Sequence, residues 1–376
     1  MLGSKPCFRA NSSEIFKTML IELRGAGVRN LENFHLEPHP KLNIIYGRNA
    51  AGKTSLLEAI YFSGTGKSFR TSATQNIISF GDDTLWIKTL IGSCSTGFMD
   101  NITITRHRNT KNVFKVNNCT SASISEIARI FPIQAIHPET YQLITGSPVI
   151  RRLFLNKGCF YIDETFVKIW KRYNHALKQR NAHLRGKTQP QVLTAIEKEL
   201  HESGTLIDRV RQNFIAALNN KLSESRKFCP YPKLRLLYQR GWSSSVELAE
   251  SLYDSRKADI KAGYTSPGPH RADMILQLEG RNVKDFFSRS QLKLASISLL
   301  IIQLDIIRDA THKDCVLLID DLSSELDSLA RDHLVNELHD SRHQCFLTSI
   351  QNDDVNQSNP ANHKMFHVKH GRIIES

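Results

Sequence analysis

The sequence predicts an α/β fold with a core of strands and helices, an antiparallel β layer beside it, and a largely helical lobe inserted into the core. Three observations predict it. A glycine-rich loop joins a predicted strand to a predicted helix near residue 50, and an apolar strand that ends in carboxylates lies far downstream. Between them, apolar residues recur at helical spacing. The core is therefore expected in two segments, 19–155 and 263–376, with the lobe at 156–262.

The composition indicates a polyanionic partner. The 376 residues carry a formal net charge of +13, with a pI near 9.4, which favours nucleic acid first and an anionic membrane surface second. No apolar run approaches the roughly 20 residues that span a bilayer, so a membrane-embedded protein has no support.

The beginning of the chain and the cysteines indicate the compartment. Residues 1–18 lack the apolar core and cleavage site of a secretory signal, and we expect a disordered extension or a start at Met19. The cysteines are scattered without C-x-x-C spacing, so neither a zinc site nor a disulfide framework is expected. Reduced thiols are typical of the cytoplasm, where we expect this protein.

The loop near residue 50 has the phosphate-binding pattern G-x-x-x-x-G-K-[ST]. Leu42 to Tyr46 predict the strand before it, and the residues from Leu56 to Tyr61 predict the helix after it. Loop N–H groups and the helix N-terminus attract phosphate oxygens. We expect Lys53 to reach the β- and γ-phosphates and Thr54 to bind Mg²⁺. The expected nucleotide-binding run is Gly47, Arg48, Asn49, Ala50, Ala51, Gly52, Lys53, Thr54 and Ser55.

The segments between the two halves of the core have distinct patterns. Alternating apolar residues from Leu85 to Val116 predict the antiparallel layer. The loop Gly64 to Arg70 is either a second phosphate-facing loop or an ordinary helix end with a basic turn. Two long amphipathic helices are predicted around 166–177 and 196–218. Their aromatic positions favour packing, and their cations form either a solvated face or a DNA-facing surface: Lys168, Lys171, Arg172, Lys178, Arg180, Arg185 and Lys187.

The second half of the site is the apolar run Val316 to Ile319 with two carboxylates after it. Asp320 is expected to bind Mg²⁺ together with Thr54, and Asp321 to orient or polarise the attacking water as a catalytic residue beside Lys53. The alternative for Asp320 is a carboxylate that caps the strand end. The long separation from the P-loop is typical of ABC-type ATPase heads, which carry an inserted lobe.

Such heads need a third element, a serine at a helix N-terminus that faces the γ-phosphate of the partner subunit. Ser288-Arg289-Ser290-Gln291 stands at the expected place, and we expect Ser288, Arg289 and Gln291 to act in trans. Ordinary helix capping by Ser288 is the alternative.

The combined motifs resemble the RecF family, bacterial DNA-gap repair ATPases related to SMC-type heads. The resemblance covers about 19 to 372. The matching segments are Gly47 to Thr54 with Leu56 to Tyr61, Gly66 to Arg70, His137 to Glu139, Gly146 to Pro148 with Arg151 to Leu155, Gly268 to Arg271 with Asp273, Ser288-Arg289 with Gln291 and Lys293, and Leu317 to Asp327.

The resemblance implies ATP and Mg²⁺ as cofactors and an ATP-dependent head-to-tail homodimer that clamps DNA and releases it on hydrolysis. It also implies action at single-strand gaps and duplex junctions, recombinase loading, a weak DNA-stimulated ATPase, RecO- and RecR-type partners, and no membrane.

The sequence departs from the family pattern at several positions. Ser290 replaces the glycine that usually follows the Ser-Arg pair, and Asn156 replaces an aspartate. The histidine of many ABC switch loops is absent, and Thr348 with Ser349 occupy the strand end instead, as the resemblance leads one to expect. Ala50 and Ala51 replace a glycine and a small polar residue, which is tolerable if φ stays negative. Two rival functions remain, a transporter ATPase subunit and a DNA-binding protein with a vestigial ATPase.

Overall fold

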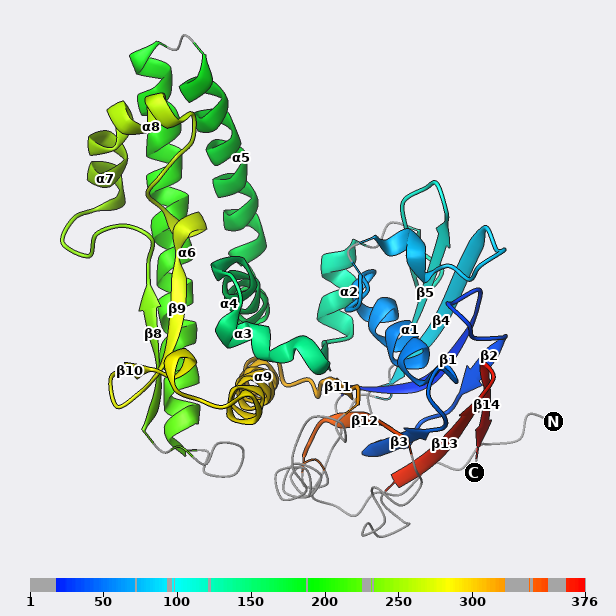
Figure 1. Ribbon diagram of the computed structural model, residues 1–376. Helices are drawn as coiled ribbons and strands as arrows, with labels where there is room; N and C mark the ends of the chain where they lie inside the picture. Colours follow the sequence, from blue (N-terminus) through cyan, green and yellow to red (C-terminus); the bar gives the residue numbers. More distant parts are fainter. Residues whose placement is uncertain are drawn as a thin grey trace. The chain divides into compact units, whose positions relative to one another are not determined.

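Figure 1 shows the computed structural model, which describes residues 18–71, 73–92, 97, 99–120, 123–186, 189–224, 231, 233–321, 338, 341–350 and 363–375. The chain divides into two compact units. Unit 1 is Met1–Pro138 with His312–Ser376, and unit 2 is Glu139–Thr311. Unit 2 extends beyond the expected lobe 156–262 at both ends. Of the extension expected at 1–18, only Thr18 lies within the described residues, and it is buried.

A six-stranded sheet in unit 1 carries the P-loop. Its strand order is β14-β13-β3-β12-β11-β7, and all of its strands run parallel except β14 at the edge. Every residue of β11 is buried, as in parallel sheets covered on both faces. The bounds are β3 Leu42–Tyr46, β7 Ile133–Ile136, β11 Val316–Ile319, β12 Gln344–Ser349, β13 His363–Lys369 and β14 Arg372–Glu375.

The expected antiparallel layer is also present in unit 1, so the α/β class with its separate β layer is confirmed. It is a five-stranded sheet in the order β2-β1-β4-β5-β6. Its strands are β1 Met19–Ala26, β2 Phe34–Leu36, β4 Thr84–Gly92, β5 Met99–His107 and β6 Val113–Val116. The short helices of unit 1 are η1 Thr74–Ile77 and α2 Ile124–Ile130.

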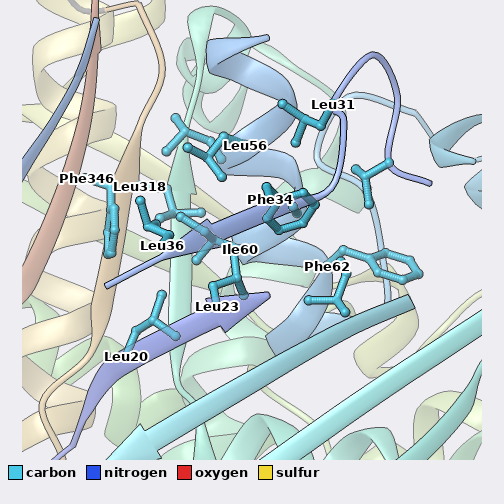
Figure 2. Close-up of a cluster of buried hydrophobic side chains, with 14 of the residues drawn as sticks. Leu20, Leu23, Leu31, Phe34, Leu36, Leu56, Ile60, Phe62, Leu318 and Phe346 are labelled. Atoms are coloured by element: carbon cyan, nitrogen blue, oxygen red, sulfur yellow. The ribbon is translucent and has the colours of Figure 1, made fainter. Parts of the chain in front are cut away.

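Helix α1, Lys53–Thr65, is buried on almost every side because it contacts strands of both sheets. Figure 2 shows Leu56, Ile60 and Phe62 of α1 among side chains from β1, β2, β11 and β12. The apolar surface removed from water stabilises such a helix by roughly 25 cal/mol per Å². This packing fixes the helix whose N-terminus ends the P-loop.

Unit 2 combines a helical hairpin with a small sheet. The hairpin arms are α5 Phe166–Arg185 and α6 Pro190–Glu224, which pack against each other as predicted. The sheet has the order β10-β9-β8. The other elements are η2 Pro138–Tyr141, α3 Gln142–Thr145, α4 Pro148–Ile162, β8 Leu234–Gln239, α7 Leu248–Asp254, α8 Arg256–Ala262, η3 Pro269–Arg271, β9 Asp273–Leu278, β10 Arg281–Asn282, η4 Val283–Asp285 and α9 Arg289–Thr311.

Helix α9 is long and apolar enough by composition to cross a membrane, although the sequence has no continuous apolar run of that length. Most of its apolar window is buried within the protein. Gln303, in the middle of the helix, donates a hydrogen bond to the carbonyl of Phe154 at 2.9 Å. These contacts are typical of the core helix of a folded unit.

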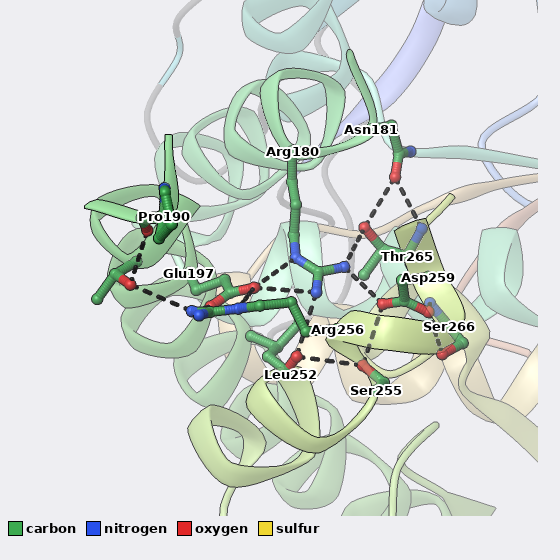
Figure 3. Close-up of polar contacts among 11 residues, drawn as sticks. Arg180, Asn181, Pro190, Glu197, Leu252, Ser255, Arg256, Asp259, Thr265 and Ser266 are labelled. Atoms are coloured by element: carbon green, nitrogen blue, oxygen red, sulfur yellow. Dashed lines mark hydrogen bonds and ion pairs between the residues drawn. The ribbon is translucent and has the colours of Figure 1, made fainter. Parts of the chain in front are cut away.

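Arg180 does not belong to the exposed basic face that the sequence predicts. Its side chain is fully buried, with ion pairs to Asp259 at 2.6 Å and Glu197 at 3.0 Å. Figure 3 shows this network, which joins α5, α6 and α8. Arg172 is exposed but pairs with Glu199 at 2.9 Å, whereas Lys168, Lys171 and Lys178 are exposed and have no ion pair within the described ranges. The exposed cationic face of α5 is therefore smaller than expected.

The family motifs at 146–155 and 268–273 are far apart in sequence but touch in unit 2. Arg151 forms two hydrogen bonds with the carboxylate of Asp273, at 2.6 and 2.9 Å.

The Tyr173 hydroxyl lies 2.6 Å from Nδ1 of His270, and Nε2 of His270 lies 3.0 Å from the carbonyl of Thr265. Since the carbonyl only accepts, Nε2 carries the proton and Nδ1 accepts from the tyrosine.

We expect Asp259→Ala to destabilise unit 2 strongly, because the substitution leaves the buried Arg180 charge without its closest carboxylate. Breaking such a pair from one side costs about 3–5 kcal/mol. Urea unfolding followed by circular dichroism measures the loss. Arg172→Met on the same helix is the control, and its unfolding midpoint is expected to stay at the wild-type value. Equal losses in both variants would contradict this account.

The pKa of His270 predicts an acid-sensitive unit 2. This pKa is lowered from 6.5 to about 4, mainly by burial and also by the neighbouring Arg271 and Arg152, while the hydrogen bond to Thr265 and the charge of Asp259 oppose the shift. The folded state thus binds fewer protons than the unfolded state between these values. Stability is present above pH 6.5 and is lost as the pH falls towards 4, by at most about 3 kcal/mol.

Urea midpoints measured from pH 4 to 7.5 test this dependence. The curve for His270→Gln, whose amide can keep both hydrogen bonds, is expected to be flatter than the wild-type curve below pH 6.5. Parallel curves for the two proteins would assign the acid sensitivity to other groups.

Candidate functional site

The P-loop runs from the end of β3 to the start of α1, and both of its glycines are required by the backbone. Gly47 has a φ of 152°, and a Cβ there would lie 2.3 Å from the carbonyl oxygen of Val368. Gly52 has a φ of 117°, which side chains rarely adopt. The terminal strand β13 therefore approaches the loop at its first residue.

Ala50 departs from the expectation that its φ would be negative. Its φ is 62°, in the left-handed region that costs a non-glycine residue roughly 1–2 kcal/mol. The carbonyl of Ala50 accepts a hydrogen bond from the side chain of Asn30 at 3.1 Å, and the carbonyl of Ala51 accepts one from the N–H of Gly371 at 2.9 Å. These bonds hold the loop in a conformation that suits the glycine of other family members.

Lys53 bends back over the loop, where its ammonium donates to the carbonyls of Gly47 at 2.6 Å and Arg48 at 3.0 Å. Burial lowers its pKa, and the carboxylates of Asp321 and Asp320 oppose that shift. A positive charge held beside donor N–H groups favours a polyanionic ligand.

Asp320, which directly follows β11, is hydrogen-bonded to residues of α1 and β12. Its Oδ1 accepts hydrogen bonds from the hydroxyls of Thr54 at 3.0 Å and Thr348 at 2.9 Å. Burial raises the pKa of Asp320, and the two hydroxyls oppose the rise. Asp321 follows with a φ of 51°, and its N–H donates to the Thr348 hydroxyl at 2.8 Å. The structure thus brings Thr54 and Asp320 together, and places Asp321 beside them.

These residues line a cavity of about 450 Å³ at the carboxyl ends of the strands, where ligands bind in open α/β sheets. Its walls are Asn30, Asn49, Ala50, Gly52, Lys53, Thr54, Ser55, Arg70, Asp320, Asp321, Thr348, Ser349 and Ile350. Arg70, at the end of the loop Gly64 to Arg70, therefore lines the same cavity. This agrees with the interpretation of that loop as a second phosphate-facing loop.

Asn30 is a site residue that the sequence does not indicate. Its side chain accepts a hydrogen bond from the Ser55 hydroxyl at 2.7 Å while it donates to Ala50. Its neighbour Arg29 pairs with Glu58, a fully buried carboxylate of α1, at 2.8 Å. A single asparagine in the turn that follows Gly27 carries no local signal for this role, because its partners are distant in sequence.

The expected partner-facing residues lie in unit 2, at the N-terminus of α9. The N–H of Ser288 donates to the side chain of Gln291 at 2.8 Å, and the hydroxyl of Ser288 accepts from the N–H of Gln291 at 3.3 Å. This reciprocal pair is a capping box, so Ser288 does cap the helix. Ser288, Arg289 and Ser290 are nevertheless exposed. The downstream segment Ser324 to Asp327 lies outside the described residues.

Comparison with known proteins decides the family. The model described as "RecF/RecN/SMC N terminal domain" matches residues 19–374. The chain is 36% identical to the DNA replication and repair protein RecF of Pseudomonas aeruginosa strain LESB58, over 93% of this chain and 95% of that protein. It belongs to the RecF family. The RecF protein of Thioalkalivibrio sulfidiphilus is also 36% identical, with 94% and 99% covered.

Solved structures agree with this family membership. The chain is similar to a RecF–ATP structure described as the recombination mediator protein of the RecFOR pathway, with 26% identity, a TM-score of 0.85, and 98% and 100% of the two chains covered. An Smc head domain from Pyrococcus furiosus, at 15% identity and a TM-score of 0.59, shares the fold.

One departure from the RecF-family pattern has a partner in unit 2. Asn156, which stands in place of the family's aspartate, accepts two hydrogen bonds from the fully buried Arg211, at 2.8 and 3.2 Å. Arg211 also donates to the carbonyl of Pro269 at 2.7 Å. The amide preserves the hydrogen bonds of a carboxylate but not its charge.

The oxygen atoms of Thr54 and Asp320 fit a magnesium ion. A hydroxyl and a carboxylate are hard oxygen donors, and Mg²⁺ in nucleotide sites uses one or two such protein ligands together with phosphates. A cation beside Asp320 would also offset the burial that raises its pKa.

The strain at Ala50 predicts opposite effects of glycine at two adjacent positions. Ala50→Gly is expected to raise the unfolding free energy by up to about 1 kcal/mol, because relief of the left-handed strain exceeds the added entropy of the unfolded chain. Ala51→Gly, where φ is negative, is expected to lower it by about 0.4–1 kcal/mol. Thermal unfolding of the two variants measures the contrast, and equal losses would show that Ala50 is unstrained.

Proposed function

We propose that this chain is an ATP-dependent DNA-binding protein of replication and recombinational repair. The observation that carries the proposal is the cavity in which the P-loop, Lys53, Thr54 and Asp320 converge. Within it, the loop N–H groups and Lys53 would bind the ATP phosphates. Thr54 and Asp320 would hold Mg²⁺, whose chemistry is to neutralise charge on those phosphates.

Hydrolysis would need a positioned water and a closed site. Asp321 is proposed to orient that water, because it follows Asp320 at the strand end and Thr348 fixes its backbone. Ser288, Arg289 and Gln291 of a second copy are proposed to complete the site. The Ser288 hydroxyl accepts the capping bond, so its proton can be donated to a γ-phosphate, and the α9 dipole attracts the same charge.

DNA is the proposed polyanion for the exposed cations of the protein. Lys168, Lys171 and Lys178 lie on α5 without ion pairs among the described residues, in a chain of net charge +13. The similarity to RecF proteins supports action at single-strand gaps and duplex junctions, weak DNA-stimulated ATP hydrolysis, and assembly with RecR- and RecO-type proteins in the cytoplasm.

Light scattering tests the ATP-dependent head-to-tail dimer. The mass is expected to double with ATP and Mg²⁺ but not with ADP. Lys53→Met is expected to lose nucleotide affinity by about tenfold or more, because it removes charged hydrogen bonds, and to remain monomeric. Ser288→Arg is expected to bind ATP and yet remain monomeric, because the larger side chain occupies the place of the γ-phosphate.

Lys88→Met, a change at an exposed lysine of β4, is the control and should dimerise like the wild type. No change of mass with ATP in the wild type would contradict the dimer. ATP binding without turnover would instead identify the vestigial ATPase, to which Ser290 points.

A further inference from the structure

A second cavity lies against the P-loop, distinct from the one that holds Asp320. Its volume is about 490 Å³. It is lined by Arg48, Asn49, Ala50 and Ala51 of the loop and by His367, Val368, Lys369 and His370 at the end of β13. All of these residues belong to unit 1.

The lining of this cavity is basic, and its exposed basic side chains have no partner within the described part of the chain. Arg48, Lys369 and His370 are exposed, and none of them has an ion pair or side-chain hydrogen bond within the described part of the chain. Among the residues that the structure describes, no carboxylate lines the cavity. The neighbouring cations of the same hairpin differ, since Lys364 pairs with Glu375 at 2.7 Å and Arg372 with Glu32 at 2.8 Å. Glu375 and Glu32 are thus engaged by Lys364 and Arg372, and neither lines the cavity.

The His367 side chain in the cavity lining is held by aromatic stacking. The ring of His367 stacks on Tyr46, the last residue of β3, with centroids 4.8 Å apart and an interplanar angle of 4°. Tyr46 immediately precedes Gly47, so the imidazole is fixed at the start of the P-loop. A fixed ring nitrogen beside an arginine and a lysine is a suitable set of donors for phosphate oxygens.

The two cavities share one wall. Asn49 and Ala50 line both of them, so the backbone that faces the nucleotide on one side faces the basic cavity on the other. The turn that carries Lys369 and His370 is also tied to the loop, because the N–H of Gly371 donates to the carbonyl of Ala51 at 2.9 Å. An anion bound by the turn would therefore change the conformational preference of the P-loop, including that of the strained Ala50.

We propose that this cavity binds a backbone phosphate of a nucleic-acid strand, and that this contact couples nucleic-acid binding to ATP binding through the shared P-loop wall. The inference rests on the proposed function, which supplies both ligands. An extended strand suits the site better than an enclosed small molecule, because Arg48, Lys369 and His370 are exposed and can be reached by a chain that passes over them.

The test is the double variant Lys369→Gln with His370→Asn. Asparagine suits position 370, whose φ is 50°. Affinity for a fluorescent duplex is measured by anisotropy over a range of salt concentrations, and affinity for a fluorescent ATP analogue is measured with and without DNA. The variant is expected to bind the analogue alone like the wild type. It should bind DNA more weakly, with a salt slope smaller by about 1.

Coupling is the decisive readout. In the wild type, DNA is expected to raise affinity for the ATP analogue by at least about fivefold, and ATP to raise DNA affinity by the same factor. Both factors are expected to fall towards one in the double variant. Lys88→Gln with Lys115→Gln, which removes two exposed charges from β4 and β6, is the matched control and should keep the wild-type coupling.

Three outcomes would overturn the inference. One is an unchanged salt slope and coupling in the double variant, and another is equal losses in the control, which would indicate diffuse charge. The third is a dependence on Lys369 and His370 for binding of inorganic triphosphate but not of DNA, which would assign the cavity to a free phosphate group. A wild type that binds neither ATP nor DNA would instead refute the proposed function itself.

Discussion

The half-buried carboxylate of Asp320 is the constraint on which the candidate site depends. It accepts hydrogen bonds from the hydroxyls of Thr54, at the start of α1, and Thr348, near the end of β12. Strands β3, β11 and β12 must therefore be in register before these hydrogen bonds can form. A buried carboxylate without such donors would pay a desolvation cost of several kcal/mol. The burial of α1 between two sheets supplies the apolar energy that keeps Thr54 at this position.

Unit 2 uses positive charge in two ways. Arg180 and Arg211 are fully buried and join helices and loops, whereas the exposed lysines of α5 have no ion pair among the described residues. Arg180 has carboxylate partners, but Arg211 has an amide from Asn156 and a carbonyl from Pro269. Part of the strong positive charge of this chain therefore serves its own architecture, and its net charge overstates the surface available to DNA.

Local sequence patterns were sufficient to predict the elements and site residues that depend on consecutive residues. The strands around the P-loop, the Val316 to Asp320 strand and the two hairpin helices could be predicted because periodicity and glycine spacing are local properties. The positive φ of Ala50, the burial of Arg180 and the role of Asn30 could not, because each is imposed by partners distant in sequence. The choice between capping and ligand binding at Ser288 is of the same kind, since the capping box is compatible with both.

Because unit 1 consists of two separate chain segments, it cannot complete its fold until late in synthesis. Strand β3 pairs with β12 on one side and β13 on the other, and both follow unit 2 in the chain. During translation, β3 and the P-loop therefore emerge from the ribosome well before the strands that pair with β3. Unit 2 is one continuous segment and can fold in the meantime. The nascent protein carries an unpaired apolar strand with two open edges during that interval, a target for chaperones and for aggregation. Nucleotide binding can begin only after translation has passed β12, so it is a late event in the life of each molecule.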